Sequence, residues 1–121
     1  MTASELVQRL QREFGLDAAI IATTDGLVVE AAQGTNEIDC EAVAAQAVSG
    51  LLMLEALGQE LASTPRQAIV EFDRHLVLVA PLDPDTALVL LASGATNLGR
   101  LRLAVRRFIP LLQQVLSEQG S

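Results

Sequence analysis

Few side chains in this sequence are of the types that carry out catalysis or bind metals. His75 is the only histidine and Cys40 the only cysteine among the 121 residues. A histidine that acts as a general base or a metal ligand needs partner side chains nearby, and Cys40 lies far from it in the sequence. His75 instead begins a run rich in valine and leucine, which favours a histidine at a strand start or on the surface. The sequence therefore predicts a protein that is not an enzyme and has no catalytic residues, no metal site and no cofactor.

Cys40 stands at the expected start of a long helix, and two interpretations of it are open. The positive end of a helix can lower the pKa of a thiol and make it reactive, whereas a lone cysteine is more often a small core residue. We favour the core residue. A single cysteine cannot pair within the chain, which suits a reducing compartment. The residues that follow Met1 also lack the basic and apolar regions of a secretory signal, so we expect a cytoplasmic protein.

Two short segments resemble ligand sites and have simpler explanations. Asp83 and Asp85 flank Pro84, and paired carboxylates can bind a cation, but aspartate and proline are also the usual residues of turns. We favour the turn. The segment from Gly94 to Gly99 leads into an expected helix, where anions can bind. It lacks the lysine and the spacing of a phosphate-binding loop, so no nucleotide binding is expected.

The basic side chains are few and half of them are grouped. All eight are arginines, and Arg100, Arg102, Arg106 and Arg107 lie within one short segment. This group is either a solvated helix face or a docking face for an acidic partner or a membrane surface. The net charge of -7 argues against nucleic-acid binding, which needs a basic face. Apolar runs such as 76–82 are far shorter than the ~20 residues of a membrane span, so no membrane insertion is expected.

The elements that must position these residues follow from hydrophobic periodicity and turn signals. At this length we expect one domain covering residues 1–121. Short connections predict an α/β (α+β) fold with a five-stranded, mostly antiparallel sheet sandwiched by helices. The expected order is α-β-β-α-β-β-β-α, with helices at 4–14, 40–61 and 98–116 and strands at 16–24, 27–32, 67–72, 75–80 and 86–92.

Local signals fix several of these boundaries. Ser4, Asp39 and Asn97 are the expected N-caps of the three helices. Gly15 should end the first helix, and Asp25-Gly26 is typical of a tight hairpin turn. Pro110 lies inside the last helical pattern and lacks the N–H that would bond the carbonyl of residue 106. It predicts a kink or an early end.

The 40–61 helix has two apolar stripes on roughly opposite sides when its residues advance about 100° each. A helix that covers a sheet within one monomer needs a single stripe. The second stripe is either covered by other helices of the same chain or buried against a second copy of the protein, and we favour the second copy. The first stripe contains Val43, Ala47, Gly50, Leu54, Leu57 and Leu61, and the second contains Ala45, Val48, Leu52 and Ala56.

A homodimer interface can be predicted from the same pattern. The stripe formed by Ala45, Val48, Leu52 and Ala56 is the expected helix seam. The 67–72 strand alternates apolar and polar residues, and we expect it to be an edge strand that pairs with its symmetry mate. Ile69 and Glu71 would then join the interface.

Several segments together resemble the Roadblock family, the dynein-light-chain-like domains also found in bacteria and archaea beside small Ras-like GTPases. The matching pieces are the first hairpin at 18–28, the alanine-rich central helix, the strands at 75–82 and 86–91, and the Asn97-Leu98-Gly99 start of the last helix. Their order and spacing cover nearly the whole chain. Pro110 is a departure from the family pattern.

This resemblance implies a homodimer with one sheet continuous across both subunits and paired central helices. It also implies a scaffold or regulator of a small Ras-like GTPase. In the bacterial polarity branch, it implies a GTPase-activating role that arranges the GTPase's own machinery without lending an arginine. The expected partner-binding ridge on the paired helices consists of Gln46, Ser49, Met53 and Glu60.

A different function remains as the alternative. It is a small-ligand sensor or general adaptor on the similar profilin-like or PAS-like plan. A sensor needs a cavity with convergent polar groups, and the sequence offers few polar candidates for its core.

Overall fold

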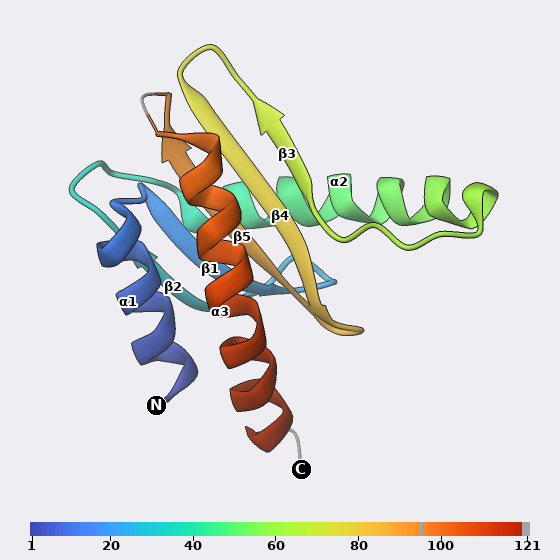
Figure 1. The fold of residues 1–121 in the computed structure, drawn as a ribbon, viewed down its shortest axis with the longest axis horizontal. Coiled ribbons are helices and arrows are strands. Elements are labelled where there is room, and N and C mark those ends of the chain that lie inside the picture. Colours follow the sequence, from blue (N-terminus) through green and yellow to red (C-terminus); the bar gives the residue numbers. More distant parts are fainter. Residues whose placement is uncertain (95, 120–121) are drawn as a thin grey trace.

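The computed structural model describes residues 1–94 and 96–119, which form three helices and five strands (Figure 1). Residue 95, inside the loop expected at 93–96, and residues 120–121 lie outside the described residues. The helices are α1 (Ala3–Phe14), α2 (Cys40–Leu61) and α3 (Leu98–Gln119), and the strands are β1 (Ala18–Thr23), β2 (Val28–Gln33), β3 (Ala68–Glu71), β4 (His75–Asp83) and β5 (Thr86–Ser93).

The strands form one sheet in the order β2-β1-β5-β4-β3, and every neighbouring pair is antiparallel. In Figure 1, α1 and α3 lie in front of the sheet, whereas α2 crosses behind it. The predicted element order, the α+β class and the sheet between helices are therefore confirmed. β3 forms one edge of this sheet and pairs with β4 alone within the described part of the chain.

The two faces of the sheet are covered very differently. Alternate residues of a strand face opposite sides, so Ala19 and Ile21 of β1 point to α1 and α3 while Ile20 points to α2. On the first face, α1 and α3 bury long apolar side chains, including Phe14 and Phe108, whose rings meet edge to face at 6.1 Å. α2 contributes fewer and smaller side chains to the second face. The buried residues of α2 are Ala44, Val48, Leu51 and Gly58.

The helix ends show where local signals decide the boundary. α2 begins after Asp39, whose carboxylate accepts the N–H of Ala42 at 3.1 Å, and α1 ends at Gly15 with a φ of 60°. Both predictions are confirmed. The predicted cap Ser4 is wrong, because Thr2 caps α1 and exchanges hydrogen bonds with Glu5 in a capping box.

α3 continues through Pro110 to Gln119, so the predicted early end is wrong. Pro110 is exposed, on the side of α3 that faces away from the sheet. The carbonyl that loses its helical N–H partner is therefore near water, which lowers the cost of the proline. The predicted cap Asn97 is confirmed, since its side-chain oxygen accepts the N–H of Gly99 at 2.6 Å.

Asp17 joins three segments that lie far apart in the sequence. Its side chain is 8% exposed. One carboxylate oxygen accepts the side-chain N–H of Asn36 at 3.2 Å, and the other accepts the hydroxyl of Ser93 at 2.9 Å. The carboxylate thus ties the loop before α2 to the start of β1 and the end of β5.

Replacing Asp17 with alanine should lower the free energy of unfolding by about 1–3 kcal/mol, because the amide of Asn36 and the hydroxyl of Ser93 lose a shared acceptor. Urea unfolding at a fixed protein concentration measures the change. Asp73→Ala, at an exposed position of the β3–β4 turn, is the matched control and should change stability by no more than about 0.5 kcal/mol. Equal stabilities of Asp17→Ala and the wild type would contradict this role.

Candidate functional site

The side chains that could take part in catalysis or metal binding do not lie close together in the fold. His75 is half-buried at the start of β4, opposite Ser93 of β5. Asp83 accepts the backbone N–H groups of Asp85 and Thr86, both at 2.8 Å, so this segment is the predicted turn. Within residues 1–94 and 96–119, no group of three or more histidine, cysteine, aspartate and glutamate side chains is placed to hold a metal ion.

Cys40 is half-buried at the first position of α2 and packs against the core under that helix. Burial raises the pKa of its thiol, and the negative charge of Asp39 raises it further. These effects oppose the helix dipole, so the interpretation of a reactive thiol with a lowered pKa is wrong. Cys40 is a small residue at the margin of the core.

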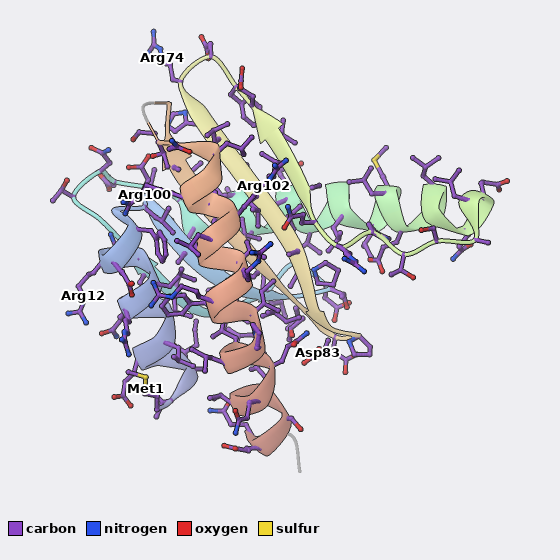
Figure 2. All side chains as sticks on the ribbon, in the orientation of Figure 1. Met1, Arg12, Arg74, Asp83, Arg100 and Arg102 are labelled. Atoms are coloured by element: carbon purple, nitrogen blue, oxygen red, sulfur yellow. The ribbon has the colours of Figure 1, made fainter. Side chains whose placement is uncertain are left out.

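The group of four arginines is split between the two flanks of α3, as Figure 2 shows for Arg100 and Arg102. Arg107 forms a salt bridge with Glu13 of α1, and Arg100 donates to the backbone carbonyl of Glu13 at 3.3 Å. Both guanidinium groups also lie over the ring of Phe14, at 5.8 and 5.4 Å from its centre. These two arginines fasten α3 to α1 and do not form a free basic face. Arg102 takes part in none of these contacts.

The orientation of α2 corrects the two-stripe prediction. The side that meets the sheet runs between the two predicted stripes and includes Leu51, which belonged to neither. Val48, a predicted interface residue, is 2% exposed and packs on the sheet, so it cannot contact a second molecule. The physical reason is that α2 touches the sheet along one narrow line at Ala44, Val48 and Leu51, which leaves both predicted stripes partly open.

Large apolar side chains of α2 are therefore exposed on the rest of its surface. The helix extends well beyond the β3 edge of the sheet (Figure 1). Among the described residues, α2 is the one helix long and apolar enough to span a membrane by length and composition, criteria that core helices also meet. The exposed side chains are Leu52 (46% exposed), Met53 (75%), Leu54 (36%), Leu57 (53%) and Leu61 (66%).

An apolar groove of about 330 Å³ lies between α2 and the neighbouring strands. Gly50 and Leu54 form part of one wall, and Val70 and Phe72 of the β3 side form part of the other, with both of the latter about half exposed. Gln46 is the one polar residue that lines it. Because a sensor pocket needs several convergent polar groups, this groove suits an apolar surface of another protein better than a small polar ligand.

The β3 edge beside this groove has free backbone groups. The N–H of Phe72 donates to the carbonyl of His75 at 2.7 Å. Hydrogen-bonded pairs alternate along an antiparallel ladder, so the backbone N–H and C=O groups of Ile69 and Glu71 point away from β4. This edge can accept another strand, as predicted for the 67–72 segment.

The structure brings some of the predicted site residues together and separates others. The expected partner-binding ridge is exposed along the side of α2 that faces away from the sheet, and it comprises Gln46, Ser49, Met53 and Glu60. Ala45, Leu52 and Ala56 are exposed on the flank opposite the groove, where Ala45 lies beside the β1–β2 turn at Gly26.

The groove between α2 and β3 could not be predicted from the sequence. Val70 and Phe72 were visible as the alternate residues of the 67–72 strand, and their spacing predicts one shared face. Leu54, Leu57 and Leu61 belong to the first apolar stripe of the 40–61 helix, whereas the predicted helix seam was the second stripe. The missing information was the rotation of α2 on the sheet.

The fold is shared with solved structures of low sequence identity. Myxococcus xanthus MglB is 15% identical, with a TM-score of 0.87 over 96% of this chain and 95% of that chain. A Roadblock/LC7 domain from Streptomyces avermitilis is 21% identical, with a TM-score of 0.85 over 97% and 99% of the two chains. Profilin II of Acanthamoeba castellanii is 14% identical, with a TM-score of 0.61 over 99% and 100%. These likenesses confirm the profilin-like architecture.

A search of curated proteins finds no match. The sequence profile of the Roadblock/LC7 domain family matches residues 2–92, which include α1, all five strands except the last residue of β5, and α2. The match covers well over half of the chain, and the sheet order and helix placement agree with it. This protein belongs to the Roadblock/LC7 domain family.

Proposed function

We propose that this protein is a non-catalytic, homodimeric regulator that binds a small Ras-like GTPase through the outward face of its paired α2 helices. The observation that carries the proposal is the surface formed by α2 and β3. Exposed apolar side chains lie there beside the open β3 edge. Two copies of the chain could cover both features by pairing with each other. Family membership supports a regulatory role over a catalytic one.

Two copies can cover this surface with a single two-fold axis beside β3. The β3 edges would pair through the backbone groups of Ile69 and Glu71, which makes one sheet continuous across both subunits. The part of α2 that extends beyond β3 would then lie over the partner's sheet. It would bring Leu54, Leu57 and Leu61 to the partner's apolar groove.

The apolar area supports a stable pair. Complete burial of a leucine, valine or phenylalanine side chain stabilises by about 1.5–3 kcal/mol. In a symmetric pair, five such side chains would be covered in each copy. The five side chains are Leu54, Leu57, Leu61, Val70 and Phe72.

Ser49, Met53 and Glu60 of the ridge would stay exposed in this dimer, because they face away from both sheets. Gln46 also lines the groove and would lie at the border between the ridge and the partner. Met53 is 75% exposed, and a flexible thioether adapts to the shape of a protein partner. α2 contains no arginine or lysine. This face therefore cannot supply a catalytic arginine, and an effect on GTP hydrolysis would act through the position of the GTPase's own residues.

Leu57→Asp should convert the dimer into a monomer, because it places a charge in the paired apolar surface. Light scattering after size-exclusion chromatography should give about twice 12.8 kDa for the wild type and 12.8 kDa for the variant. Leu103→Asp, at a leucine of α3 with similar exposure (47% against 53%), should stay dimeric.

Leu52→Asp distinguishes the two flanks of α2. We expect it to remain a dimer, since Leu52 lies on the flank away from the groove. Dissociation by Leu52→Asp and not by Leu57→Asp would instead assign the interface to the flank of Ala45, Leu52 and Ala56. A wild-type protein that is monomeric at high concentration would contradict the homodimer.

Met53→Arg should weaken GTPase binding by about tenfold or more without changing the mass of the dimer, because an exposed apolar anchor is lost. Interferometry against small Ras-like GTPases from the same genome, loaded with GDP or a non-hydrolysable GTP analogue, measures the affinity. Leu103→Arg is the control, with the same kind of change outside the ridge. Equal affinities of Met53→Arg and the wild type would remove the ridge from the proposal.

A further inference from the structure

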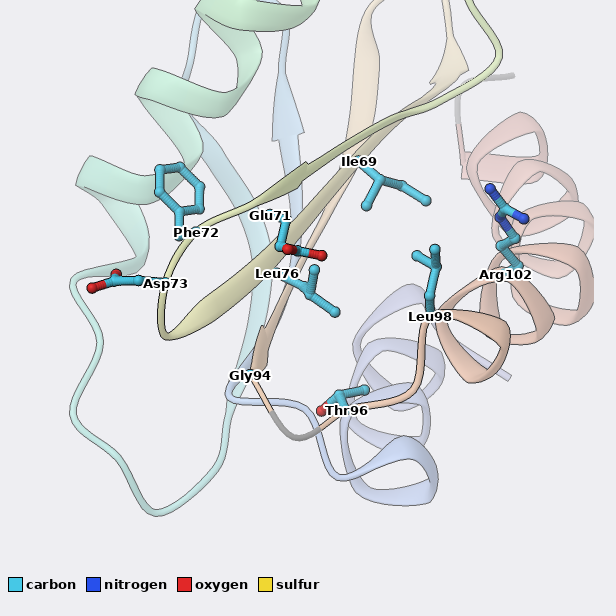
Figure 3. Close-up of a pocket in the computed structure, with 9 residues that line it drawn as sticks. All are labelled: Ile69, Glu71, Phe72, Asp73, Leu76, Gly94, Thr96, Leu98 and Arg102. Atoms are coloured by element: carbon cyan, nitrogen blue, oxygen red, sulfur yellow. The ribbon is translucent and has the colours of Figure 1, made fainter.

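Two hollows follow one another along the flank of α3 that faces β3, on the opposite side of the sheet from α2. The first, of about 570 Å³, lies between β3, β4 and the start of α3 (Figure 3). The second, of about 410 Å³, lies between the middle of α3 and the segment that leads into β3. They exist because α3 covers the central strands and leaves β3 uncovered on this side. We refer to the two hollows together as the α3 groove.

Apolar side chains line part of each hollow of the α3 groove, and the second hollow is the more apolar of the two. In Figure 3, Ile69, Leu76 and Leu98 converge on the first hollow. Val105 and Ile109, on the same flank of α3, continue this surface into the second hollow. Leu98 is 39% exposed, although it stands beside buried core residues. Such a strip can anchor the apolar side chains of a peptide.

The charges along the α3 groove are unusual for this protein. Arg102 lines the first hollow, and Arg66 and Arg106 line the second. Across the described ranges 1–94 and 96–119, none of these three arginines takes part in a salt bridge, although the chain has fifteen acidic residues against eight basic ones. Arg102 and Arg106 are one turn apart on α3 and lie on the flank opposite Arg100 and Arg107.

The acidic residues of the α3 groove lie at its other end. The carboxylate of Glu71 lies in the first hollow beside Leu76, whereas Asp73 lies at the turn beyond it (Figure 3). The three arginines thus outnumber the two carboxylates, and they are concentrated toward the second hollow. The groove therefore has a direction, with an acidic end at the β3–β4 turn and a basic end beside the middle of α3.

We propose that the α3 groove binds an acidic amphipathic segment of a partner protein, with apolar residues on the strip from Leu98 to Ile109 and carboxylates at Arg102, Arg106 and Arg66. The basic rim matches the carboxylates, and the concave apolar strip matches a peptide better than a flat membrane surface. This site is on the opposite face of the sheet from the proposed GTPase ridge and does not depend on it.

A labelled peptide of about 15 residues, roughly 22 Å long as a helix, tests the proposal by fluorescence anisotropy with the full-length protein. One face of the peptide carries leucines and the other carries glutamates. The glutamate peptide should bind, and binding should weaken as salt is raised. The same peptide with lysines in place of the glutamates should not bind.

The double variant R102E/R106E should bind the glutamate peptide at least about tenfold more weakly and lose most of the salt dependence. R9E/R12E, with two charge reversals on exposed positions of α1, should bind within about twofold of the wild type. Leu98→Ser should weaken binding and leave the salt dependence unchanged, because it removes apolar contact only.

Three results would overturn the proposal. The first is equal binding by the wild type and R102E/R106E, or equal binding of the glutamate and lysine peptides. The second is no saturable peptide binding up to about 1 mM. The third is a failure to bind the peptide together with R102E/R106E-sensitive binding to vesicles of anionic phospholipid, which would assign the arginines to a membrane surface.

Discussion

The central constraint on this molecule is the narrow contact between α2 and the sheet. Only Ala44, Val48, Leu51 and Gly58 of this helix are buried, although the helix is long and carries large apolar side chains that stay exposed between Leu52 and Leu61. The other face of the sheet is well covered, because α1 and α3 pack leucine and phenylalanine side chains against it. The core between the sheet and helices α1 and α3 is thus buried within one chain, whereas the α2 side leaves apolar side chains in water. A large exposed apolar surface of this kind marks an interaction site in a soluble protein.

This asymmetry gives the two faces different uses. The α2 face has an open strand edge, an apolar groove and an extended helix. In the proposed dimer, a second copy of the chain pairs with the edge and covers the apolar side chains. The α3 face has a buried core and a separate groove, whose arginines form no salt bridge in the described part of the chain. Asp17 holds the loop before α2 against the sheet and so fixes where α2 begins. In the proposed function, the protein acts by binding partners through these two surfaces.

The element order, the sheet class and most helix ends could be predicted from the sequence because they depend on local signals. Asp39 and Gly15 act on the backbone within a few residues, and they end or begin a helix regardless of tertiary packing. The early end expected at Pro110 is wrong because the cost of this proline depends on which side of α3 meets water. The surface proposed as the dimer interface was only partly predictable for the same reason. A helical wheel shows that α2 has excess apolar surface, but the rotation of the helix depends on how small residues such as Ala44 fit a particular sheet.

Hydrogen exchange at the free edge of β3 tests the central claim most directly. We expect the amides of Ile69 and Glu71, which have no partner strand within one described chain, to exchange slowly at high protein concentration and faster on dilution. Protection that depends on concentration would show a second strand bonded to this edge. Exchange at both amides as fast as at an exposed turn, at every concentration, would show that β3 remains unpaired and would contradict the homodimer on which the proposed function rests.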